Sequence, residues 1–254
     1  MYLQRIERAT PLAPTLNMTL TAWIDILGAT MLGRAPLFAD TYRIKHLSAG
    51  SAGLRELMGC EDRVMYLISE IACLEALKLQ NMLSDMDLCS HIESLAHQID
   101  MTEDASSLLL PPPPPSSAVM VDPRTLTAQM TAAFRCAARI YLCSLVPGFD
   151  RTQPQIVSLL DKLMAVLDAV PAGPDGFDRS LVWVFLIAGG VAAPDGAFRA
   201  FFDQRCAALG DEGEYGSFGC MRTVLDELWR VRAAGDDASW RDVMAVRGWQ
   251  YLLV

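Results

Sequence analysis

Prolines divide this chain into long proline-free blocks, and their spacing limits what the chain can fold into. The fourteen prolines among 254 residues gather at a few points, the largest being the run Pro111–Pro115. Within the blocks, apolar residues recur at three- and four-residue steps, as Val64, Ile68 and Ile71 do between positions 61 and 80. The alternating pattern and turn dipeptides of β-hairpins are missing. We therefore predict an all-α fold, an irregular array of about nine to ten packed helices.

The helical periodicity also predicts where each helix lies. Three starts carry plausible capping residues: Asp178, Ser217, and Ser239 with Asp242 three positions later, the spacing of a weak capping box. The expected helices span residues 20–32, 61–80, 84–97, 125–145, 154–169, 179–192, 197–209, 218–232 and 240–253.

A proline-rich segment, residues 100–123, separates two helical parts. Consecutive prolines donate no backbone hydrogen bonds and favour the polyproline II conformation, so we expect a disordered loop here. The alternative is a ligand for a proline-binding module, although no clear basic residue flanks the run. Wide apolar faces on both sides predict that residues 1–99 and 124–254 pack across the loop into one domain spanning 1–254.

Charge and composition exclude several classes of protein. A net charge of −9 and a pI near 4.8 repel nucleic acid, so we expect no direct nucleic-acid contact. No apolar run approaches the length needed to span a bilayer, so we expect no membrane segment. The seven cysteines lie mostly in apolar stretches, which is typical of reduced core residues in an intracellular protein.

Sequence motifs for catalysis and for metal binding are missing. The chain has only three histidines and no C-x-x-C pair, which argues against a zinc site. It also contains no G-x-S-x-G elbow and no glycine-rich phosphate loop. We therefore predict no catalytic residue, no metal ligand and no cofactor.

Four charged residues lie inside apolar helical blocks and are the candidate site residues. Arg135 and Arg139 are four positions apart and share a helix face, while Glu70 lies in a separate apolar block. Because buried charges usually pair, we expect Glu70 to bind one of these arginines. The alternative is that a buried charge, Asp25 above all, is the polar contact of a ligand pocket.

Aromatic and methionine side chains indicate a large, adjustable interior. Trp183, Tyr141 and Met65 are the candidate lining of a lipophilic pocket between helices. The simpler interpretation is that these side chains fill the core.

Several long blocks resemble the fungal-specific transcription factor domain, the regulatory region that follows a six-cysteine binuclear zinc cluster. The nearest likeness is to regulators of sexual fruiting-body development in filamentous ascomycetes. The resemblance covers residue 20 to the C-terminus apart from the proline-rich segment. Its blocks are GCEDRVMYLISEIACLEALK at 59–78, FRCAARIYLCSLVPGF at 134–149, AVPAGPDGFDRSLVWVFLIAGG at 169–190 and FRAFFDQRCAALGDEGEYGSFGCMRTVLDELW at 198–229.

The resemblance implies an all-helical, non-enzymatic regulatory domain that works in the nucleus, as a homodimer and through transcriptional co-regulators. In a sterol-sensing subset of the family the domain binds a lipid, which implies a small lipophilic ligand as a further partner. The zinc cluster that reads DNA is absent from this chain, so we expect a truncated or divided gene product. Two alternatives stay open: a helical interaction scaffold without a ligand, and a lipid-carrying or lipid-modifying protein.

Overall fold

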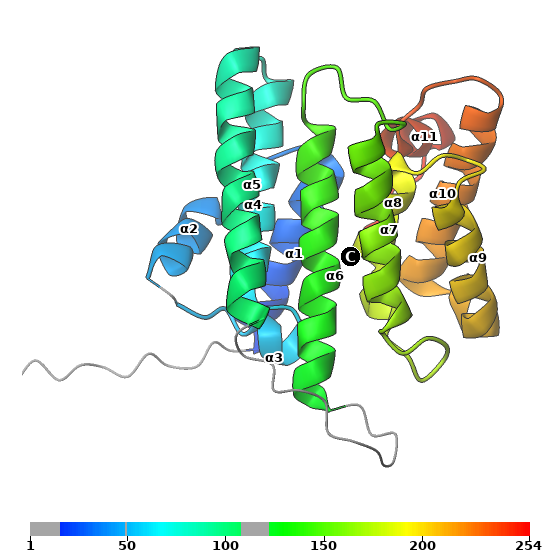
Figure 1. The fold of residues 1–254 in the computed structure, drawn as a ribbon, viewed down its shortest axis with the longest axis horizontal. Coiled ribbons are helices and arrows are strands. Elements are labelled where there is room, and N and C mark those ends of the chain that lie inside the picture. The colour runs from blue at the N-terminus through cyan, green and yellow to red at the C-terminus, as the bar shows by residue number, and fades with distance from the viewer. Residues whose placement is uncertain (1–15, 49, 108–121) are drawn as a thin grey trace, which may run out of the picture.

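The computed structural model describes residues 16–48, 50–107 and 122–254, and its fold is all-α (Figure 1). Within those ranges there are eleven α-helices, two short 3-10 helices and no strand. The first part holds α1 (Leu16–Leu32), α2 (Ala39–Leu47), α3 (Leu54–Met58), α4 (Asp62–Leu79) and α5 (Asp85–Ser107). The second holds α6 (Pro123–Ser144), α7 (Pro154–Asp168), η1 (Asp178–Ser180), α8 (Val182–Val191), α9 (Ala197–Leu209), η2 (Gly210–Glu214), α10 (Gly216–Ala233) and α11 (Trp240–Arg247).

The structure corrects two predicted boundaries. Helix α5 continues to Ser107, so the first residues of the expected 100–123 loop are helical. The proline run Pro111–Pro115 lies outside the described residues. The last helix ends at Arg247 rather than near 253, because Gly248 adopts a left-handed conformation that terminates it. The structure also contains two short helices, α2 and α3, that the sequence pattern did not predict.

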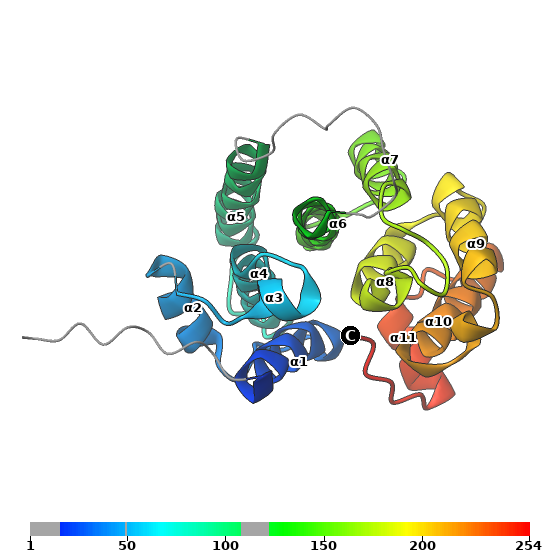
Figure 2. The same cartoon turned by 90° about the horizontal axis from the view of Figure 1, so that it is seen from below.

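Helix α6 occupies the middle of the molecule. It packs against α4 and α5 on one side and against α7 and α8 on the other, as Figures 1 and 2 show. Helices α9, α10 and α11 lie beyond α8, and the chain then returns so that its C-terminus lies beside α1 (Figure 2). Leu253 is fully buried there. The end of the sequence therefore packs against its first described helix.

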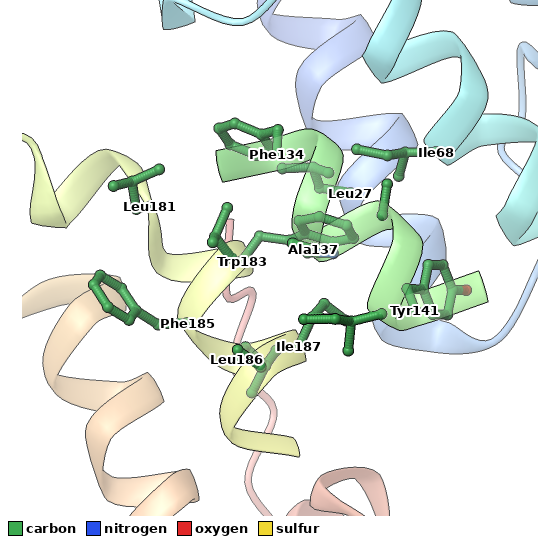
Figure 3. Packing of buried hydrophobic residues seen from close by; sticks show 14 of the residues in the cluster. Leu27, Ile68, Phe134, Ala137, Tyr141, Leu181, Trp183, Phe185, Leu186 and Ile187 are labelled. Carbon is green, nitrogen blue, oxygen red and sulfur yellow. The ribbon is translucent and has the colours of Figure 1, made fainter. Parts of the chain in front are cut away.

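The hydrophobic core follows from the composition of α8. Its sequence, VWVFLIAGGV, is apolar on every face, and a helix of that kind must be buried on all sides. Figure 3 shows Trp183 and Ile187 of α8 beside Phe134 and Ala137 of α6, with Leu27 and Ile68 from the first part of the chain nearby. These residues belong to one core cluster. Residues on both sides of the undescribed segment 108–121 thus share a core, and the single-domain assignment stays a prediction.

Among the described helices, none combines the length and the apolar character needed to cross a membrane.

Candidate functional site

A buried carboxylate, Glu75 on α4, lies at the centre of a polar network that joins distant parts of the chain. Arg241 on α11 donates to both of its oxygens, with both distances 2.8 Å. The hydroxyl of Tyr141 on α6 donates to Glu75 Oε2 over 2.6 Å. Only 6% of Glu75 is exposed. With three donors, the carboxylate is paired and hydrogen-bonded as a buried charge requires.

The same network reaches the end of α1 and the start of α8. The Arg241 guanidinium also donates to the backbone carbonyls of Thr30 and Met31. The Thr30 hydroxyl accepts a 2.8 Å hydrogen bond from the Trp183 indole and donates to the Leu27 carbonyl. Five helices, α1, α4, α6, α8 and α11, therefore meet through one connected set of hydrogen bonds.

The electrostatics of the network keep Tyr141 neutral and Arg241 charged. Burial, reinforced by the charge of Glu75, raises the pKa of Tyr141 well above its usual value, so the phenol stays a neutral donor. Burial alone would lower the pKa of Arg241, but the hydrogen bonds and charge of Glu75 raise it. Neither Tyr141 nor Arg241 therefore exchanges protons near neutral pH. The role of this hydrogen-bond network is to hold the helices together.

A second buried ion pair fixes the turn before α8. Arg205 on α9 donates twice to Asp178, over 2.8 and 2.6 Å, and also to the carbonyls of Leu167 and Val170. Burial raises the pKa of Asp178, and the hydrogen bonds from Arg205 oppose that shift. Asp178 was expected to cap the following helix, but its side chain binds Arg205 instead.

The structure does not bring Glu70 together with Arg135 or Arg139. Glu70 binds Arg43 on α2, with distances of 2.9 and 3.0 Å, in a partly exposed position. The two arginines share a face, as expected, but it faces α5: Arg139 lies 3.6 Å from Asp100, and Arg135 donates to the Thr102 carbonyl. The physical reason is that Glu70 lies on the side of α4 that α2 covers.

The buried partner that sequence reasoning missed is Glu75, five positions beyond Glu70. Five residues correspond to a rotation of about 140° around an α-helix, so the two carboxylates point to different neighbours. A signal was present in the sequence, because Glu75 follows Ile68 and Ile71 at heptad spacing on the apolar stripe of α4.

Asp25 is a capping residue rather than the polar contact of a ligand pocket. Its carboxylate accepts hydrogen bonds from the backbone N–H groups of Leu37 and Phe38, over 2.8 and 3.0 Å, and from the Tyr42 hydroxyl over 3.0 Å. Helix α2 has no capping side chain of its own at Phe38. Asp25 therefore satisfies the free N–H groups at its start from the neighbouring helix α1.

The three residues expected to line a pocket lie in the packed core. Met65, Tyr141 and Trp183 are all buried. Trp183 stacks on Phe134 with ring centres 6.0 Å apart and meets Tyr141 edge to face at 6.2 Å, as Figure 3 illustrates. These rings fill the space around one another, which matches the core-filling interpretation.

Burial lowers the reactivity of several cysteine thiols, whereas Cys89 is exposed. All seven cysteines are free. Burial raises the pKa of Cys206 to about 12 and that of Cys73 to about 11, which keeps both thiols protonated and weakly nucleophilic. Over the described parts of the chain, no group of three or more His, Cys, Asp or Glu side chains could hold a metal ion.

Comparison with known proteins places this helical array in a family. The sequence profile of the fungal specific transcription factor domain matches residues 10–254. The chain is 51% identical over 273 residues to the transcriptional regulatory protein pro1 of Neurospora crassa, covering 96% of this chain and 39% of that protein. It is 24% identical to the transcription factor dibT of Pestalotiopsis microspora, covering 90% of this chain and 39% of dibT.

A third relative, the ustiloxin B cluster transcription factor ustR of Aspergillus flavus, is 24% identical over 82% of this chain and 36% of its own length. The chain thus spans about two fifths of the length of these curated relatives. No solved structure matches the chain. The chain therefore belongs to the fungal specific transcription factor domain family, whose members are transcriptional regulators and not enzymes, as the resemblance of its helical blocks implied.

Proposed function

We propose that this chain is the regulatory region of a fungal transcription factor, working in the nucleus through contacts with co-regulatory proteins and with a second copy of itself. The family match over residues 10–254 is the observation that carries this proposal. The relatives extend well beyond the matched region, so we assign DNA reading to a part of the protein outside this chain. The net charge of −9 supports a role without direct contact to DNA.

The described site supports a function that depends on contacts with other proteins rather than on catalysis. Its charged groups are saturated by partners within the protein, and the proposal requires neither a cofactor nor a catalytic residue. A bound lipophilic ligand is a weaker candidate at the expected position, because Tyr141 and Trp183 pack directly on each other there.

A reporter assay tests the proposed function. The chain is fused to a heterologous DNA-binding module, and transcription from a promoter carrying that module's site is compared with transcription driven by the module alone. We expect the fusion to raise or lower reporter output in fungal nuclei. Output identical to that of the module alone, with the fusion present at equal amounts in the nucleus, would contradict the proposal.

Self-association is measured separately on the purified chain. Native mass spectrometry should record the mass of two copies at micromolar concentration, and it also reports any retained lipid. A monomer at every concentration would remove the second copy from the proposal without affecting the reporter result.

A further inference from the structure

An apolar groove lies between α1 and α2, away from the buried network. Met18, Thr21 and Ala22 from α1 line one side, and Phe38, Tyr42 and Lys45 line the other. The groove holds about 260 Å³. Helix α2 lies at the outer edge of the molecule in both ribbon views, so the groove is at one end of the helical array (Figures 1 and 2).

The edges of this groove expose large apolar side chains. Met18 is 55% exposed and Phe38 is 49% exposed, and Leu37 and Ile44 beside them are also exposed. Contiguous apolar surface on a folded protein marks a place where another molecule binds. The groove and these side chains therefore form a candidate docking surface.

The size and shape of the groove favour a protein side chain as its occupant. Small-molecule sites usually hold roughly 300–1,000 Å³ and enclose most of the ligand. This groove is smaller, and it lies between two neighbouring helices. Such grooves receive the apolar face of an amphipathic helix, whose anchoring side chains recur at three- and four-residue steps.

The charge of the groove indicates which kind of partner helix it would bind. Lys45 is the one charged residue among those that line the groove. Its ammonium donates to the neutral carbonyl of Ser51 over 2.8 Å, and none of the ion pairs found among the described residues includes it. The Asp62 carboxylate accepts hydrogen bonds from the backbone N–H groups of Ala52 and Leu54. The groove therefore offers an ammonium group that has no ion-pair partner among the described residues.

The segment around Lys45 holds further cations, two of which are already paired. Residues 16–55 contain four arginine or lysine residues and two acidic residues. Arg43 and Arg55 form ion pairs with Glu70 and Glu61, whereas Lys45 forms none among the described residues. One of the two acids is Asp25, which is buried and bonded to three donors. A second copy docked on the groove by two-fold symmetry would bring two Lys45 ammonium groups toward each other, which disfavours self-association here.

We propose that the groove between α1 and α2 binds an α-helix of a partner protein, with apolar side chains on one face and carboxylates on the polar face. An apolar anchor enters between Met18 and Phe38, and a carboxylate of the partner pairs with Lys45. This inference specifies one of the partner contacts required by the proposed function. Its test uses purified protein without transcription, so the two can fail independently.

The experiment uses two synthetic helical peptides with identical leucine anchors, one with glutamate and one with lysine on the polar face. Fluorescence anisotropy measures their binding to the wild-type chain and to three variants. K45E reverses the charge and F38S removes an edge of the groove. The matched control V246S changes a side chain on α11 that is 86% exposed. Circular dichroism melts verify that each variant folds.

We expect the glutamate peptide to bind the wild type more tightly than the lysine peptide, with the difference shrinking at high salt. K45E and F38S should each weaken binding about tenfold, or about 1.4 kcal/mol, while V246S should leave it unchanged. Equal binding of both peptides, or of the glutamate peptide to wild type and F38S, would overturn the proposal. The proposal would also be overturned if the wild-type chain formed a dimer that F38S abolishes, or if the chain bound phosphatidylserine vesicles and neither peptide.

Discussion

At the scale of single residues, burial decides how much each charged side chain contributes to the free energy of unfolding. Glu75→Ala should lower the free energy of unfolding by about 3–5 kcal/mol, because it leaves the Arg241 guanidinium and the Tyr141 hydroxyl without their partner. Glu70→Ala is the matched control on the same helix, and it should cost at most about 1 kcal/mol, since Glu70 forms a partly exposed pair with Arg43. Urea denaturation followed by circular dichroism measures both. Equal losses for the two variants would contradict the assignment of Glu75 as the buried member.

The same comparison shows what sequence reasoning could reach at this scale. The apolar sequence around Glu70 led to the prediction that Glu70 is the buried, paired carboxylate of the 61–80 block, but Glu75, which also follows apolar residues, is the buried one. The partner of Glu75 lies 166 positions away on α11. Local patterns carry no information about a contact across that separation. The pairing therefore becomes visible only when the helices are placed in space.

At the scale of helices, the sequence predicted long periodic segments well and short ones poorly. The expected helix at 197–209 coincides with α9, and the one at 154–169 is α7 with its last residue removed. Helix α2 was missed because its capping group, Asp25, comes from another helix. Helix α3, at Leu54–Met58, is too short to establish a periodic pattern.

Capping predictions succeeded where the whole motif is local. In α11, the Ser239 side chain accepts from the Asp242 N–H, and the Asp242 carboxylate accepts from the Ser239 N–H, as the capping box predicted. Ser217, in contrast, lies inside α10, which begins at Gly216. Reciprocal hydrogen bonds within four residues are readable from sequence, whereas a lone serine near a helix start is ambiguous.

Removing that cap should loosen the helix that carries Arg241. We expect Ser239→Ala to cost about 0.5–2 kcal/mol in the free energy of unfolding, because an N–H at the start of α11 loses its acceptor. Amide hydrogen exchange should increase first in α11. Ser84→Ala, which alters a similar Ser–Asp contact beside α5, controls for general effects of the substitution. Unchanged exchange in α11 would show that tertiary contacts alone fix its start.

A pH-dependent contact docks α11 on α10. Hydrogen bonds from Arg230, which has the larger effect, and from Arg247 lower the pKa of Glu227 to about 2. A carboxylate whose pKa is lower in the folded state stabilises the protein above its unfolded pKa, and this contribution disappears as pH falls through the folded pKa. The stabilisation should therefore be complete above about pH 5 and decline toward pH 2.

Glu227→Gln isolates this contribution. The variant should unfold at a lower urea concentration than the wild type near neutral pH. This gap between the two urea midpoints should narrow as the pH is lowered below about 4. High salt should also narrow the gap, because Arg230 and Arg247 are partly exposed. A gap that stays constant over the whole pH range would mean that the ionisation of Glu227 does not stabilise the fold.

At the scale of the whole molecule, the central helix α6 and the Glu75 network make the two helical parts depend on each other. Helices α4 and α5 precede the undescribed segment 108–121, and both pack against α6, which follows it. Arg241, near the end of the chain, binds Glu75 on α4 and the carbonyls at the end of α1. Neither part can bury its apolar faces or satisfy these charged groups without the other, so we expect one cooperative unit.

Cutting the chain tests this dependence. A protease site introduced within Pro111–Pro115 should be cleavable without separating the two pieces, which should elute together from a size-exclusion column in native buffer. The melting temperature of the cut protein should then rise with protein concentration, because unfolding now releases two chains, whereas that of the intact chain should not. Glu75→Ala in the cut protein should weaken the association, since it removes a contact between the pieces, and Glu70→Ala should not. Pieces that elute separately and each retain a cooperative melt would show that residues 1–99 and 124–254 fold as two independent domains.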